Sequence, residues 1–203
     1  IGEEKDIRQM VGRYTTALGE YGLKNDYFEN KEEAETFKEE LSFLVLNQMY
    51  SPNSPTWFNV GKGDVYGIEK GGQNGIFAYN KESGKMEETI SDYQNPQCSA
   101  CFILGLEDKL FGEGSITDWW ETETRLFKFG SGSGVTLQYL RSIGEHLSGG
   151  GESSGAQSFA KVSDQIADVV KSGGITRRAA KMDVQHINHP EVIPFIDWKV
   201  DSE

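Results

Sequence analysis

Cysteine is scarce in this sequence, with two residues among 203, and proline and histidine are nearly as rare, with five and three. Two cysteines cannot form the disulfide framework of a small secreted domain, so a reduced, cytoplasmic location is expected. No uninterrupted apolar stretch approaches the ~18 residues of a membrane-spanning helix. The charged first residues also lack the apolar segment of a secretory signal. The sequence therefore predicts neither a membrane protein nor a disulfide scaffold.

Basic residues are also few. The sequence has 20 lysines and arginines against 32 aspartates and glutamates, which gives a formal net charge of −12. This acidity disfavours non-specific binding to nucleic acid or to an anionic membrane, because both are negatively charged. Any bound anion must be held by a local basic cluster. The hydrophobic content of 36% suffices for the core of one domain or slightly more. Because the chain opens on Ile1 and stops at Glu203 in a charged helical run, we expect a fragment of a longer polypeptide.

The first part of the chain predicts two helices. Apolar residues recur at helical spacing over residues 5–22. Asn30 can cap a second helix that runs to about Met49. Residues 51–61 hold Pro52 and Pro55, which predict a rigid extended loop rather than a helix.

From residue 96 onward, short apolar runs alternate with amphipathic segments. We expect strands at residues 101–104, 135–140 and 179–187, and helices at residues 117–128, 158–170 and from 188 onward. The first of these strands is predicted to be buried, and Asn188 to cap the last helix. In the helix at 158–170, the apolar residues share one face, which consists of Phe159, Val162, Ile166, Val169 and Val170. Strand alternating with helix implies parallel pairing in an α/β sheet or barrel.

Cys98 and Cys101 form a C-x-x-C pair. Such a pair could be half of a zinc site, but the sequence has no second cysteine pair. It could be a thioredoxin-type redox pair, which requires a helix N-terminus to lower the thiol pKa, whereas Cys101 opens an apolar strand. The two residues could also be small buried side chains, and the spacing alone leaves these alternatives open.

Two glycine-rich segments follow. Residues 130–134 come after a helix and before a strand, which is the reverse of a dinucleotide-binding fingerprint, so a tight turn is favoured. Residues 147–155 form a long glycine and serine loop, which can be either a connector or a binding loop.

The segment 171–181 gathers four basic residues beside two glycines in an otherwise acidic chain. These residues are Lys171, Arg177, Arg178 and Lys181. We interpret them as an anion cradle rather than a solvated turn. His186 and His189, three residues apart at a strand-to-helix junction, favour a capping or surface role over metal binding.

Together these segments resemble the catalytic subunit of ribonucleotide reductase, and most of all its adenosylcobalamin-dependent class. The matching runs are Asn-Ser-Pro-Thr-Trp-Phe-Asn-Val-Gly at 53–61, Ser-Ala-Cys-Phe-Ile at 99–103, Phe-Gly-Ser-Gly-Ser-Gly at 129–134, Leu-Ser-Gly-Gly-Gly at 147–151 and Lys-Ser-Gly-Gly-Ile-Thr-Arg-Arg-Ala-Ala-Lys-Met at 171–182. Each run alone is weak, but five in the right order are highly specific.

The resemblance implies an α/β fold in which an N-terminal helical region precedes roughly the first half of a ten-stranded α/β barrel. Residues 1–60 would form the helical region with a substrate-site loop. Residues 61–95 would form a glycine-rich hairpin or excursion, and residues 96–203 the half-barrel with its effector and specificity loops. The implied activity is the reduction of ribonucleotides to 2′-deoxyribonucleotides by thiyl-radical chemistry for DNA synthesis.

The resemblance also implies roles for particular residues. Cys101 matches the cysteine that delivers electrons to the ribose 2′ position and becomes disulfide-bonded. Ser54 and Ala100 would line the substrate site with it. Asp108 and Arg141 match effector-site residues, with Lys128 a weaker candidate.

The resemblance also implies two specificity loops and several binding partners. The loop at 147–151 matches the first specificity loop of the family. The second, which would relay effector identity to the substrate base, comprises Gly173, Gly174, Ile175, Thr176, Arg177 and Arg178. The expected partners are a ribonucleotide substrate, a deoxynucleotide effector, a thioredoxin-like reductant and a second copy in a homodimer. Adenosylcobalamin would be bound mainly by segments absent from this chain, and we assign no metal ligands.

The sequence departs from the family in one important respect. The thiyl-radical cysteine and the cysteine that pairs with Cys101 belong to the second half-barrel, which is absent here. We therefore expect an enzyme fragment that is inactive alone. A stand-alone nucleotide-binding regulatory module is the alternative, and a generic oxidoreductase that pairs Cys98 with Cys101 is a third possibility.

Overall fold

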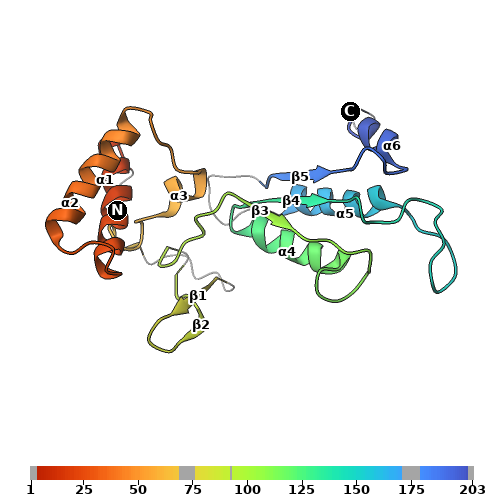
Figure 1. The fold of residues 1–203 in the computed structure, drawn as a ribbon, viewed down its shortest axis with the longest axis horizontal. Coiled ribbons are helices and arrows are strands. Elements are labelled where there is room, and N and C mark those ends of the chain that lie inside the picture. The colour runs from red at the N-terminus through yellow and green to blue at the C-terminus, as the bar shows by residue number, and fades with distance from the viewer. Residues whose placement is uncertain (1–3, 69–75, 92, 171–178, 201–203) are drawn as a thin grey trace. The chain divides into compact units, whose positions relative to one another are not determined.

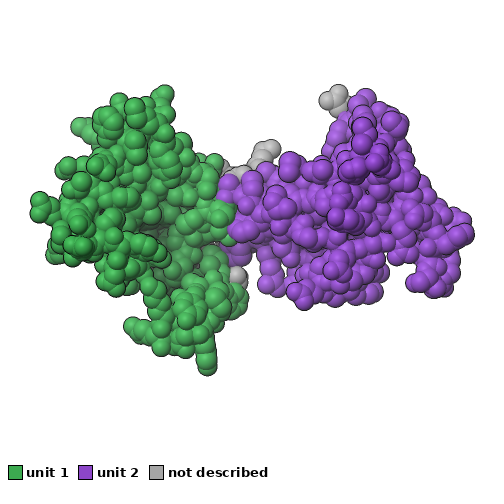
Figure 2. Space-filling view, viewed as in Figure 1, with its two compact units in different colours: residues 1–99 green, residues 100–203 purple. Residues whose placement is uncertain are grey.

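The computed structural model describes residues 4–68, 76–91, 93–170 and 179–200. The chain forms two compact units, residues 1–99 and residues 100–203 (Figure 2). The predicted specificity loop at Gly173–Arg178 lies outside the described residues. None of the helices in the described part of the chain is long and apolar enough to span a membrane.

The first unit is built on two packed helices, as predicted (Figure 1). Helix α1 (Ile7–Lys24) begins where the Asp6 carboxylate accepts from two backbone N–H groups of the first turn. Helix α2 (Lys31–Leu46) begins at Asn30, whose side chain accepts from the backbone of Glu33, which confirms the predicted cap. The two helices enclose a small core of Val11, Tyr14 and Val45, with Leu18, Leu41, Trp57 and Val60 packed against it.

The prediction of an extended loop at residues 51–61 is wrong. Helix α3 (Ser54–Asn59) forms there, because Asn53 caps it and Pro55 lies in its first turn, where a missing N–H costs nothing. Within residues 61–95, where the sequence indicates a hairpin or an excursion, the structure has an antiparallel pair of strands. It consists of β1 (Phe77–Asn80) and β2 (Lys85–Glu88).

The second unit holds a parallel three-stranded sheet in the order β3–β4–β5, which confirms the predicted parallel pairing. Its strands are β3 (Cys101–Leu104), β4 (Gly132–Thr136) and β5 (Lys181–Val184). The middle strand therefore starts three residues before its predicted position, inside the glycine-rich segment. Backbone contact explains this shift, since a Cβ on Gly132 would lie 2.7 Å from the carbonyl oxygen of Ala180 on the neighbouring chain segment.

The two faces of this sheet differ. Side chains alternate along a strand, and the register places Leu104, Val135 and Asp183 on one face and Ile103, Gly134 and Met182 on the other. The first face packs under helices α4 (Ile116–Lys128) and α5 (Ala156–Val169). On the second face, Ile103 is 78% exposed and Met182 is 56% exposed. The predicted burial of the strand at 101–104 is thus wrong for Cys101 and Ile103, whose face the two helices do not cover.

The core of the second unit lies between the helices and the sheet. It consists of Leu106, Ile116, Trp119, Val135, Leu137, Leu140, Ala156 and Ala160. Helix α5 buries the small residues Ala156, Ala160 and Ser163, while Val162 and Val169 are exposed. Two valines of the expected apolar face are thus left uncovered, and the helix is packed through its small side chains instead.

The last helix also differs from expectation. Helix α6 (Val192–Asp197) begins after Glu191, so Asn188 does not cap it. The Asn188 backbone N–H instead donates to Nδ1 of His186 in the preceding turn.

Candidate functional site

Cys101 opens strand β3 on the face of the sheet that the helices leave uncovered. Its register partner on β4 is Gly132, and two residues later Ile103 pairs with Gly134. Neighbouring atoms approach both glycines closely, with the Ala180 carbonyl oxygen beside Gly132 and the end of the Ile103 side chain beside Gly134. Cys101 is exposed and its thiol is free.

Cys98 lies in a different environment. Its thiol donates to the backbone carbonyl of Pro96 at 3.2 Å. Burial raises the pKa of the Cys98 thiol, which keeps it protonated and poorly nucleophilic. Both cysteines are free thiols. Of the two thiols, Cys101 is therefore the more accessible.

Ser54 is exposed in the first turn of α3, and this helix is held at both ends. The guanidinium of buried Arg13 donates to the carbonyl of Trp57 at 2.8 Å and to that of Val60. The hydroxyl of Thr56 donates to the carbonyl of Cys98 at 2.9 Å. Thr56 thus ties helix α3 to the chain segment at Cys98. Sequence reasoning missed both Arg13 and Thr56, because their partners lie more than 40 positions away.

Asp108 and Arg141, the two residues that match effector-site residues of the family, form an ion pair. Arg141 Nε lies 2.5 Å from Asp108 Oδ2, and both side chains are about two-thirds buried. Asp108 follows β3 and Arg141 follows β4, and the carboxyl ends of parallel strands share one edge of a sheet. Arg141 also donates to the carbonyl of His146 at 3.4 Å, inside the glycine and serine loop region.

Lys128 is not brought to this pair. It is the exposed last residue of α4, four residues before β4 begins. Lys128 therefore lies near the amino end of β4, at the edge of the sheet opposite Arg141. Ala100 also lies at that edge, where its carbonyl accepts from the backbone of Gly132 at 2.6 Å.

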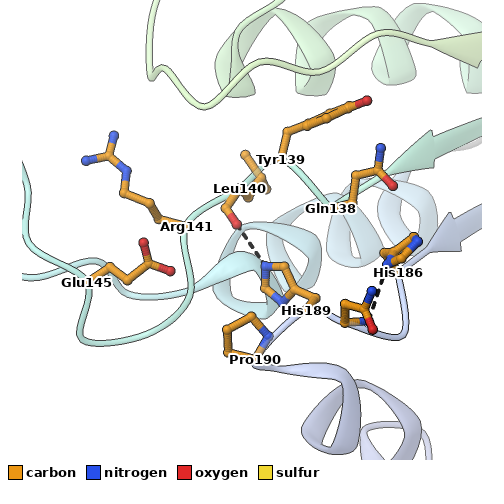
Figure 3. A pocket seen from close by; sticks show the side chains of 9 residues that line it. Gln138, Tyr139, Leu140, Arg141, Glu145, His186, His189 and Pro190 are labelled. Carbon is orange, nitrogen blue, oxygen red and sulfur yellow. Dashed lines mark hydrogen bonds between the residues drawn. The ribbon is translucent and has the colours of Figure 1, made fainter.

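A pocket of about 540 Å³ opens next to Arg141 (Figure 3). Two segments line it, one after β4 and one after β5. The lining residues are Gln138, Tyr139, Leu140, Arg141, Glu145, His186, Asn188, His189 and Pro190. Hydrogen bonds from the Ser142 hydroxyl and backbone lower the pKa of the Glu145 carboxyl, which keeps it ionised at the rim.

Of the predicted basic cluster, Lys181 alone falls among the described residues, and its charge is already matched. Its ammonium lies 3.0 Å from Asp183 and 3.6 Å from Asp164, and it donates to the Ser163 hydroxyl at 2.7 Å. Only 10% of the Lys181 side chain is exposed. Lys181 therefore belongs to a buried polar cluster rather than to a free anion cradle.

Comparison with known proteins agrees with this arrangement. The family described as "Ribonucleotide reductase, barrel domain" matches residues 99–203. The chain therefore belongs to the ribonucleotide reductase family. The family described as "Class II vitamin B12-dependent ribonucleotide reductase" matches residues 1–48.

Individual relatives fall in the same class. The chain is 48% identical over 202 residues to a vitamin B12-dependent ribonucleotide reductase of Agrobacterium fabrum, and 46% identical over 200 residues to one of Bradyrhizobium diazoefficiens. These alignments cover 100% and 98% of this chain but 16% of each relative. The chain thus spans about a sixth of the length of these relatives.

A solved structure supports the fold. The alpha subunit of the Actinobacillus ureae class Id ribonucleotide reductase superposes with a TM-score of 0.57, at 17% identity, over 97% of this chain and 28% of that one. The predicted fold class, a helical region followed by part of the α/β barrel, is confirmed.

Proposed function

We propose that the full-length protein reduces ribonucleotides to 2′-deoxyribonucleotides by radical chemistry, and that this chain supplies its helical region and the first part of its barrel. The observation that carries the proposal is the position of Cys101. Its side chain is exposed on the face of the barrel sheet that the helices do not cover, and its thiol is free. Membership of the ribonucleotide reductase family supports this assignment.

In this proposal Cys101 is one of two reducing thiols. The 2′-hydroxyl of the ribose leaves as water, and the two electrons come from Cys101 and a second cysteine outside this chain, which become a disulfide. A thioredoxin-like dithiol then restores both thiols. Ser54 at the start of α3 and the backbone at Ala100 would hold the substrate, so that the ribose lies against the thiol and water is excluded.

The radical step would be supplied by adenosylcobalamin when it is bound. We assign no described residue of this chain to it. The pocket of about 540 Å³ is too small for a corrin ring with its nucleotide and adenosyl groups. The cofactor would therefore be held mainly by segments outside this sequence, in a cytoplasmic enzyme.

We also propose that the edge of the sheet with Asp108 and Arg141 binds a deoxynucleotide effector. Arg141 can pair with phosphate through two parallel N–H donors, and Asp108 fixes the guanidinium while offering an acceptor to a ribose hydroxyl. The adjacent pocket has the size and mixed polarity that suit a nucleotide. The second specificity loop would carry the identity of the effector to the substrate, and the full enzyme would be a homodimer.

The test uses the full-length protein with adenosylcobalamin, a ribonucleoside triphosphate or diphosphate, and a dithiol. Cys101→Ser should abolish multiple turnover, while the matched variant Cys98→Ser should keep most of it. Equal loss in both variants would contradict the assignment of Cys101 and favour a C-x-x-C mechanism. Nucleotide binding without any reduction by the wild type would favour a regulatory module instead.

A further inference from the structure

His189 connects the two walls of the pocket beside Arg141. Its side chain is buried, with 8% exposed. Nε2 lies 2.9 Å from the carbonyl oxygen of Leu140, and Nδ1 accepts from the backbone N–H of Glu191 at 3.1 Å. Because Nδ1 is an acceptor here, the proton is on Nε2, and the neutral ring donates to Leu140. Figure 3 shows this bond reaching from the segment after β5 to the segment after β4.

Glu191 extends the same connection to helix α5. Its carboxylate is buried and accepts from the backbone N–H of Ala156 at 2.7 Å. The residue at the start of this helix, Gly155, has no side chain to cap it. Glu191 therefore supplies the missing cap from 35 positions away, where a negative charge also suits the helix dipole. A Cβ at Gly155 would collide with this carboxylate.

These contacts fix three separate segments to one another. Leu140 immediately precedes Arg141, so a fixed Leu140 carbonyl limits where the Arg141 backbone can lie. Arg141 in turn holds Asp108 from its side chain. The charged groups near the His189 ring are Glu145 and Arg141 on the segment after β4 and Glu191 on its own turn. Helix α5 comes directly after the 147–155 loop, and the backbone N–H of its first residue, Ala156, donates to the Glu191 carboxylate.

We propose that His189 and Glu191 are positioning residues for the nucleotide site at Asp108 and Arg141. The neutral His189 ring sets the position of the Arg141 backbone, and Glu191 couples that position to the start of α5. This proposal rests on the proposed effector site. A guanidinium that must meet a phosphate tolerates little displacement, so loss of the Leu140 bond weakens nucleotide binding although His189 itself does not touch the nucleotide.

The experiment compares two substitutions of His189, each of which keeps one of the two hydrogen bonds of the imidazole and loses the other. His189→Gln has an amide N–H that can reach the Leu140 carbonyl, as Nε2 does. His189→Asn keeps only an acceptor near Nδ1 for the Glu191 N–H. In the full-length protein, binding of radiolabelled dATP, dGTP and dTTP is measured by equilibrium dialysis. The Gln variant should bind within about twofold of the wild type, and the Asn variant about five- to tenfold more weakly, as expected for one lost buried hydrogen bond.

A second pair tests the coupling to α5. Glu191→Gln retains an acceptor for Ala156, and Glu191→Ala removes it. In wild type and Glu191→Gln, added deoxynucleotide should slow amide hydrogen exchange in peptides that contain Ala156. In Glu191→Ala this protection should be lost. If His189→Asn does not fold, the hydrogen-exchange measurement on the wild type still tests the proposal. Absence of nucleotide-dependent protection at Ala156 in the wild type overturns it.

The outcomes distinguish an error in the proposed effector site from an error in the proposed role of His189. If the wild type binds none of the three deoxynucleotides, the proposed effector site is wrong. If the wild type binds but His189→Asn binds equally well with a lower melting temperature, His189 only packs the fold and the present proposal is wrong. Retained binding in the Gln variant together with weakened binding in the Asn variant supports it.

Discussion

The hydroxyl of Ser133 donates to the carboxylate of Glu123 at 2.7 Å in the interior of the second unit, where Glu123 is fully buried. The hydroxyl of Ser163 donates to the other oxygen of the same carboxylate. Ser163 in turn accepts from Lys181 at 2.7 Å. This chain of contacts joins α4, β4, α5 and β5, so one buried carboxylate connects four elements of the barrel unit.

Replacement of Glu123 should therefore destabilise the protein. Glu123→Ala leaves the buried hydroxyls of Ser133 and Ser163 without their acceptor and creates a cavity, and should lower the free energy of unfolding by about 3 kcal/mol. Glu123→Gln keeps the shape and one acceptor, and should cost about 1 kcal/mol. Urea-unfolding midpoints of both variants provide the measurement. Equal midpoints for the two variants would show that the shape and the acceptor retained by glutamine do not contribute to stability.

The same cluster predicts a pH dependence through Asp183. Burial raises the pKa of this carboxyl above its ordinary value of 3.8, while the nearby Lys181 ammonium opposes the shift. The folded state thus holds its proton more tightly than the unfolded state does. Stability from this group is present at low pH and is lost as the pH rises from about 3.8 through the raised pKa.

Asp183→Asn should remove this part of the pH profile. The comparison is the melting temperature of wild type and variant from acid to neutral pH. The wild type should lose stability relative to the variant as the pH rises over that window. An unchanged difference between the two proteins across the window would contradict the assignment.

The two cysteines should differ in their reaction with iodoacetamide. Burial raises the pKa of Cys98, so little of it is thiolate at pH 8, whereas Cys101 is exposed on the open sheet face. Cys101 should be alkylated several-fold faster in the native protein. Peptide mapping by mass spectrometry gives both rates, and denatured protein serves as the control in which the rates should converge. Faster labelling of Cys98 would reverse the proposed roles.

The glycines of β4 should tolerate substitution unequally. An alanine Cβ at Gly132 would lie 2.7 Å from the backbone oxygen of Ala180, whereas at Gly134 it would meet the flexible end of Ile103 at 2.9 Å. Gly132→Ala should cost roughly 2 kcal/mol and Gly134→Ala less than 1 kcal/mol. Gly149→Ala, which meets nothing within 4 Å, is the matched control and should be neutral. A neutral Gly132→Ala would show that the β4–β5 pairing can readjust.

Several features could be predicted because they depend on neighbours in the sequence. The Asn30 cap and the first two helices follow from local hydrogen bonding and apolar spacing. The parallel pairing follows from alternation of strands and helices. The expectation at residues 51–61 was wrong because proline breaks a helix interior but suits a first turn, and only the placement of Asn53 as a cap distinguishes the two.

The sequence by itself determined that the chain is an α/β protein of the ribonucleotide reductase family, because ordered motifs carry that information locally. The tertiary structure decided which distant residues meet. It placed Arg13 on the end of α3, His189 against Leu140, and Glu191 at the start of α5. It also placed Lys128 at the opposite edge of the sheet from Arg141. The physical reason is that each of these contacts joins a buried donor and acceptor from separate elements, which pair only once the packing of those elements has excluded water.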